Sequence, residues 1–160
     1  MHPDFASVRL NDIMGKHLMT ENVYTPKGRV MIAGACMHTV EPEAYAQLAG
    51  QVDEVYELCL EETHINMAVT KIAAILGTGR VTKLVFASVD RSPHCTQMHY
   101  IPHEIERTMK QHIPMEHYVV SEGKVVRVTE SAIELSKSLA KLSTGMYGDS
   151  NQGGEPTRFS

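Results

Sequence analysis

The clearest pattern along the chain is a pair of short apolar runs that contain few polar residues. They cover Val30 to Ala35 and Leu84 to Val89. A strand with one solvent-exposed face alternates apolar and polar residues, whereas a strand covered on both faces is apolar almost throughout. Both runs therefore predict buried strands of a mostly parallel sheet.

The segment between these strands has the three- and four-residue spacing of helices. An amphipathic helix is expected from Pro42 to Leu60. Its apolar stripe consists of Tyr45, Leu48, Val52, Val55, Cys59 and Leu60. A second helix is expected after Thr63, whose hydroxyl can cap it, and ends near Gly77 and Gly79. The order strand, helix, helix, strand predicts a right-handed crossover between two parallel strands. Because Cys59 lies in the apolar stripe, we expect it to be a core residue.

The following segment predicts further helices and a hairpin. Helical residues are expected from 93 to 111, with a break at Pro102 and a new helix starting near it. The runs 117–120 and 124–128 flank a turn that contains Gly123, which is typical of a β-hairpin. Thr129 can cap a last helix, which ends towards Gly145.

The two ends of the chain are expected to differ from the middle. Residues 1–27 hold apolar positions at roughly helical spacing and predict an N-terminal helical arm. Residues 146–160 have little to bury, so we expect a mobile tail. The order of the elements predicts a single α/β domain over residues 1–145. Its fold class is a three-layer sandwich with a short, mostly parallel sheet and an antiparallel edge hairpin.

Composition narrows the range of partners. The chain has 15 Lys and Arg against 19 Asp and Glu, so its formal charge of -4 argues against nucleic-acid binding. We find no membrane-length apolar run. Three widely separated cysteines do not form a disulfide framework, which predicts a reducing cytoplasm. Nine histidines are present, and five of them lie between positions 94 and 117.

Residues 83–103 contain most of the candidate site residues. Asp90 ends a predicted strand, and Ser92 followed by Pro93 is typical of a helix start. Cys95 then lies in the first helical turn, where unpaired N–H groups favour a thiolate. His94 is adjacent to Cys95, and His99 follows four residues later on the same helical face.

A second group of candidate residues follows the first buried strand. Gly34 permits close approach of a ligand to the backbone, and Cys36 and His38 follow it two and four residues later. Because parallel strands end at the same edge of a sheet, Cys36 and Cys95 are expected to lie together there, with their sulfurs no more than about 15 Å apart.

These residues lead to a first hypothesis of a metal- or iron–sulfur-binding redox protein. Cys36 and Cys95 supply thiolates, and His38, His94 or His99 completes the ligand set. Sulfur and imidazole ligands suit zinc or an iron–sulfur cluster. The expected partner is a small molecule or a redox partner protein, and a homo-oligomer is possible because three cysteines cannot form an all-cysteine set of four in one chain.

Two alternatives stay open at this point. In the first, the protein is an enzyme in which Cys95 is the nucleophile, His94 the base and Asp90 the group that orients the base. In the second, it is a non-catalytic subunit that binds a small ligand at the same edge, close to Gly34 and Ser92.

Overall fold

The computed structural model describes residues 14–147. Within these residues, six strands form one sheet in the order β1-β3-β2-β4-β5-β6. Neighbouring strands are parallel except for the antiparallel pair β5 and β6 at one edge. The strands are β1 (Lys16–His17), β2 (Gly28–Gly34), β3 (Glu54–Leu58), β4 (Val81–Val89), β5 (Met115–Ser121) and β6 (Lys124–Val128).

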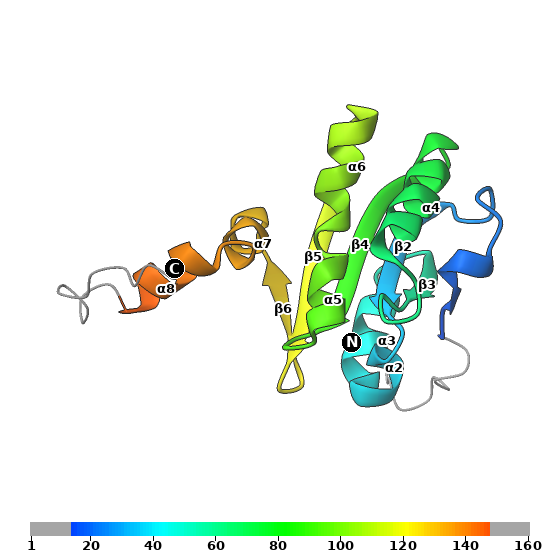
Figure 1. Ribbon diagram of the computed structural model, residues 1–160. Helices are drawn as coiled ribbons and strands as arrows, with labels where there is room; N and C mark the ends of the chain where they lie inside the picture. Colours follow the sequence, from blue (N-terminus) through cyan, green and yellow to red (C-terminus); the bar gives the residue numbers. More distant parts are fainter. Residues whose placement is uncertain (1–13, 148–160) are drawn as a thin grey trace. The chain divides into compact units, whose positions relative to one another are not determined.

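The helices connect these strands and continue beyond the last one (Figure 1). They are the 3-10 turn η2 (Leu18–Thr20), α2 (Met37–Val40), α3 (Pro42–Ala49), α4 (Ile65–Gly77), α5 (Pro93–Met98), α6 (Ile101–Met109), α7 (Glu130–Ser136) and α8 (Leu139–Tyr147). The chain divides into two compact units, a sheet unit that ends at Val128 and a C-terminal unit that begins at Thr129.

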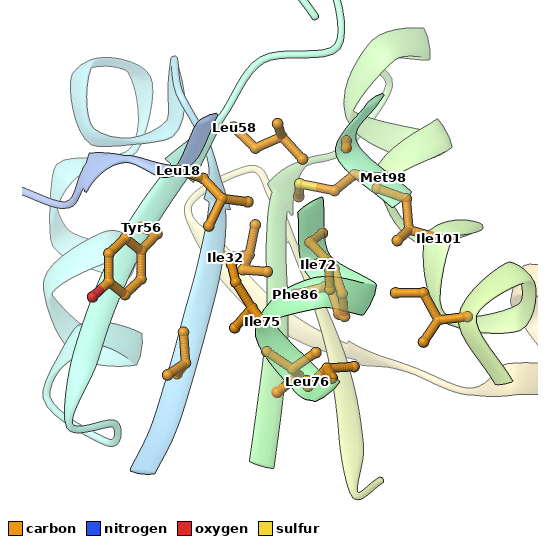
Figure 2. Close-up of a cluster of buried hydrophobic side chains, with 14 of the residues drawn as sticks. Leu18, Ile32, Tyr56, Leu58, Ile72, Ile75, Leu76, Phe86, Met98 and Ile101 are labelled. Carbon is orange, nitrogen blue, oxygen red and sulfur yellow. The ribbon is translucent and has the colours of Figure 1, made fainter. Parts of the chain in front are cut away.

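Two hydrophobic clusters hold the helices of the sheet unit on opposite faces of the sheet. The larger cluster joins α4, α5 and α6 to one face, and Figure 2 shows Ile32 and Phe86 of the strands meeting Ile72 of α4. The smaller cluster joins α2 and α3 to the other face, where Met31 packs with Tyr45 and Leu48. This arrangement is a three-layer α/β sandwich, so the predicted fold class is confirmed.

Several predicted elements are also confirmed. The two buried runs form β2 and β4, which pair in parallel. The hairpin turn has Glu122 at φ 52° and Gly123 at φ 75°. Positive φ at both central residues is characteristic of a tight hairpin turn whose twist matches that of the strands. A new helix, α6, begins at Ile101, directly before Pro102.

The single helix predicted from Pro42 to Leu60 is wrong. Helix α3 ends at Ala49, and Glu54 to Leu58 form strand β3, which pairs with β2 on the side opposite β4. The alternation of residues in β3 places Tyr56 and Leu58 in the larger cluster. Its polar residue Glu57 is buried rather than solvent-exposed, because Tyr45 of α3 donates a hydrogen bond to it.

The predictions for the ends of the chain have mixed outcomes. Lys16 and His17 form a strand beside β3, and the 3-10 turn η2 follows it, so the described part of the N-terminal arm contains no α-helix. Residues 1–13 lie outside the described residues, as do residues 148–160 of the predicted tail. The helix capped by Thr129 ends at Ser136, and α8 follows as a separate helix.

Candidate cysteine site at the carboxyl edge of the sheet

All three cysteines lie at the carboxyl ends of adjacent parallel strands. Cys36 follows β2, Cys59 directly follows β3, and Cys95 lies in α5 after β4. Figure 1 shows α2 and α5 following β2 and β4 at the same end of the sheet. In the strand order, β2 lies between β3 and β4. The chain segments that carry the three thiols therefore emerge side by side, at the edge where open α/β sheets hold their ligands.

The three thiols line one pocket, which we call the cysteine pocket. Its volume is about 90 Å³. The lining residues are Gly34, Ala35, Cys36, Leu58, Cys59, Leu60, Glu61, Ser92, His94, Cys95 and Met98. The prediction that Cys36 and Cys95 lie together at this edge is confirmed.

Helix α5 fixes the position of Cys95. The backbone N–H of Cys95 donates to Ser92 Oγ over 3.4 Å, and Pro93 occupies the first turn of the helix. This is the predicted helix start, in which a side-chain oxygen accepts an otherwise unpaired N–H. Cys95 is only 8% exposed. A Cβ atom placed on Gly34 would lie 3.1 Å from Cys95 Sγ, so glycine at this position leaves room for the sulfur beside β2.

The three cysteines of the pocket differ in their exposure to solvent. Cys36 is exposed, Cys59 is partly exposed and Cys95 is buried. Partial burial raises the pKa of the Cys36 thiol, and the neighbouring Cys95 raises it further through charge and a side-chain hydrogen bond. Cys59 acts on Cys36 through charge alone. The thiols of Cys36 and Cys95 are thus in direct interaction, and Cys59 is the more distant member of the set.

The structure separates the other predicted site residues into those inside and those outside the pocket. His94, Ser92 and Gly34 line it together with the cysteines. Asp90 is not among the lining residues, and its backbone N–H donates to the carbonyl of Val120. The roles that we predict for these residues stay predictions.

His38 lies in a different polar cluster, on the face of the sheet covered by α2 and α3. Its Nδ1 is 2.8 Å from Glu57 Oε1, but the two groups are not aligned for a hydrogen bond. The hydroxyl of Tyr45 donates to the same Glu57 oxygen over 3.0 Å and accepts the N–H of Gly15 over 2.8 Å. His38 therefore lies beside the carboxylate of Glu57 and does not line the cysteine pocket.

His99 lies in a buried hydrogen-bonded chain of its own. Its Nε2 is 2.7 Å from Ser88 Oγ, and its Nδ1 is 2.9 Å from Nδ1 of His117. Burial lowers the pKa of His99 to about 3, with a further contribution from His117, and burial lowers the pKa of His117 to about 4. Both rings are therefore neutral at neutral pH, and a single N–H joins the two Nδ1 atoms. This arrangement directs His99 towards β4 and β5.

The sequence interpretation missed Cys59 as a pocket residue. It placed Cys59 in a helical stripe because residues 42–60 fit a helical period as well as a strand after a turn. The residues that could have corrected it are Gly50 and Asp53, which lie between α3 and β3. Glycine and aspartate are common in turns.

Comparison with known proteins identifies the family. Residues 25–148 match the model of the Rossmann-like domain, and the chain belongs to this family. No curated protein and no solved structure matches the chain. Among residues 14–147, no helix is both long enough and apolar enough to cross a membrane.

The turn after β2 does not have the dinucleotide-binding sequence of many Rossmann folds. That sequence places glycines at three positions, G-x-G-x-x-G, so that the pyrophosphate can approach the backbone. Here Gly34 occupies the first position, whereas Cys36 and Thr39 occupy the second and third. The pocket of about 90 Å³ is also smaller than the roughly 300 Å³ at the lower end of small-molecule sites. A cysteine site thus occupies the edge where such folds commonly bind nucleotides.

Proposed function

We propose that this protein binds a metal centre in the cysteine pocket, either an iron–sulfur cluster with a redox role or a zinc ion. The observation that carries the proposal is the position of Cys36, Cys59 and Cys95 at the ends of three adjacent parallel strands, around one pocket. Thiolates are soft ligands, which select zinc and iron–sulfur clusters rather than magnesium or calcium.

The described side chains do not already form a metal site. Four thiolates around one zinc ion, each at about 2.3 Å, lie within about 4 Å of one another. Among the side chains that the structure describes, no three His, Cys, Asp or Glu residues are gathered in this way. The proposal therefore rests on the shared pocket of the three cysteines and not on an already arranged set of ligands.

Three cysteines leave one ligand position of a four-iron cluster to another group. Two further pocket residues have suitable side chains, the imidazole of His94 and the carboxylate of Glu61. A small molecule can also fill the position, which would bring a substrate to the cluster.

We propose a small molecule or a redox partner protein as the electron partner. We also propose a reducing cytoplasm as the compartment, because it keeps the thiols available.

Metal analysis of anaerobically purified protein tests this proposal. After reconstitution with iron and sulfide, we expect stoichiometric iron and acid-labile sulfide and a broad absorbance band above about 400 nm. Cys36→Ser, Cys59→Ser and Cys95→Ser should each lose most of the bound iron. His99→Gln is the matched control, because this ring lies outside the pocket, and it should retain the iron.

Two results would contradict the proposal. The first is a correctly folded wild-type protein that takes up neither iron and sulfide nor zinc. The second is a Cys59→Ser variant that loads as well as the wild type, because the third thiolate would then have no part in the site. Circular dichroism of each variant separates loss of the site from loss of the fold.

The alternative enzyme, with Cys95 as nucleophile, has less support. His94 lines the pocket, but Asp90, the predicted orienting carboxylate, does not. The small pocket volume likewise gives little support to a subunit that binds a nucleotide-sized ligand.

A further inference from the structure

Cys36 and Cys95 have the arrangement of a pair of reacting thiols. They follow adjacent parallel strands, β2 and β4, whose last paired residues are Ala33 and Ala87. Both line the cysteine pocket, and their side chains interact directly. Gly34 leaves the space beside β2 into which the Cys95 sulfur fits.

The two thiols differ in access to solvent. Cys36 is exposed, whereas Cys95 is buried. In thiol–disulfide exchange the accessible thiol is the one that meets a soluble oxidant, and a second thiol close to it completes the reaction. In this pair, Cys36 is therefore the thiol that meets the oxidant, and Cys95 is the buried thiol that reacts second.

We propose that Cys36 and Cys95 form a reversible intramolecular disulfide when the pocket holds no metal centre, with a low-molecular-weight disulfide as the oxidant. In the first step the Cys36 thiolate attacks one sulfur of the small disulfide. A mixed disulfide forms on Cys36, and one small thiolate leaves and takes up a proton. In the second step the Cys95 thiolate attacks the Cys36 sulfur, which forms the protein disulfide and releases the second small thiol. The protein loses two electrons and two protons, and the small disulfide is reduced to two thiols.

The disulfide would regulate the proposed metal site. It removes two of the three pocket thiolates from coordination and leaves only Cys59. Its formation rests on the geometry of the thiols alone, whereas its effect on metal loading rests on the proposed function.

The test uses the metal-free full-length protein, prepared with a chelator and a reductant and transferred to anaerobic buffer. Oxidised glutathione is added as the oxidant, and the products are followed by intact mass and by peptide mapping without reduction. We expect a species lighter by two hydrogens, with Cys36 and Cys95 joined. The Cys59→Ser variant is the matched control and should form the same disulfide at a similar rate.

The single variants identify the order of the steps. Cys95→Ser should stop at a glutathione adduct on Cys36. Cys36→Ser should react at least tenfold more slowly, because Cys95 is buried and Cys59 is only partly exposed. A stable glutathione adduct on the wild-type protein, or a main product that includes Cys59, would overturn the inference. Peptide mapping of the wild type decides this even if a variant does not fold.

Metal loading separates this inference from the proposed function. The oxidised protein should take up at least tenfold less iron than the reduced protein, and reduction should restore uptake. If the disulfide forms but the reduced protein takes up neither iron and sulfide nor zinc, the disulfide stands and the proposed function fails. If the reduced protein loads but no disulfide forms, the function stands and the inference fails.

Discussion

At the scale of single residues, Gly34 sets the space available to the Cys95 sulfur. Replacing it with alanine would put a Cβ atom 3.1 Å from Cys95 Sγ, so the sulfur would have to move by a few tenths of an ångström. We expect Gly34→Ala to cost about 1 to 3 kcal/mol of stability. The rate of disulfide formation between Cys36 and Cys95 should fall by roughly tenfold, because reaction rates depend steeply on the placement of the reacting atoms.

A second glycine provides the control for this experiment. Gly77 ends α4 and has nothing within 4 Å of the position of a Cβ atom. Gly77→Ala should raise stability by up to about 1 kcal/mol through helix propensity and leave the disulfide rate unchanged. An unchanged rate in Gly34→Ala, with the fold intact, would show that Gly34 does not control the position of the sulfur.

The buried rings of His99 and His117 make stability depend on pH. Their pKa values, about 3 and about 4, lie below the ordinary value of 6.5 because burial disfavours the charged ring. Between about pH 6.5 and about pH 4 the unfolded chain therefore binds protons that the folded chain does not. The free energy of unfolding should rise with pH across this window and fall as the solution is acidified, by an amount on the order of a few kcal/mol.

Urea unfolding at several pH values measures this dependence. The double variant His99→Gln/His117→Gln should lose much of the slope between about pH 7 and about pH 5, because the groups that titrate are gone. His112→Gln is the control, since the side chain of His112 is 82% exposed. An equal slope in the wild type and the double variant would mean that these two rings do not cause the acid sensitivity.

At the scale of the elements, strand β3 depends on its contacts with α3. Tyr45 is fully buried, and its hydroxyl joins Glu57 of β3 to the N–H of Gly15. Tyr45→Phe would leave the buried carboxylate and this N–H without their shared partner. We expect a loss of about 1 to 3 kcal/mol in the free energy of unfolding, which is the cost of unsatisfied buried polar groups.

The control for this loss is an exposed tyrosine. Tyr24 is 65% exposed, and Tyr24→Phe should change stability by less than about 0.5 kcal/mol. Denaturant unfolding at constant pH gives both values. If the two variants lose equal stability, the hydroxyl of Tyr45 is not needed to hold β3 against α3.

At the scale of the whole molecule, the two hydrophobic clusters of the sheet unit contain none of the described residues beyond Val125. All six strands of the sheet also end by Val128. A protein that stops after Val128 should therefore keep cooperative thermal unfolding and the iron content of the full chain. Calorimetry and metal analysis measure the two properties, and a truncated protein without a cooperative transition would disprove the autonomy of the sheet unit.

The sequence by itself determined those elements whose causes are local. The buried runs of β2 and β4 are apolar on both faces, and no helical period competes with them. Proline restricts the backbone at the start of α5, and Gly123 accepts the positive φ that the hairpin turn requires, whatever surrounds them. Parallel pairing of β2 and β4 then followed from the connection between them, and it brought Cys36 and Cys95 to one edge.

Only the tertiary structure decided the elements and contacts that depend on distant partners. Residues 54–58 carry a pattern that fits a helix or a strand, and pairing with β1 and β2 selects the strand. That choice moves Cys59 from a helix stripe to the cysteine pocket. His99 likewise has a side chain that suits a metal, but its neighbours are Ser88 and His117, which come from β4 and β5. The spacing of residues along the chain could not predict strand β3 or the contacts of His99. Both depend on residues that belong to other elements of the fold.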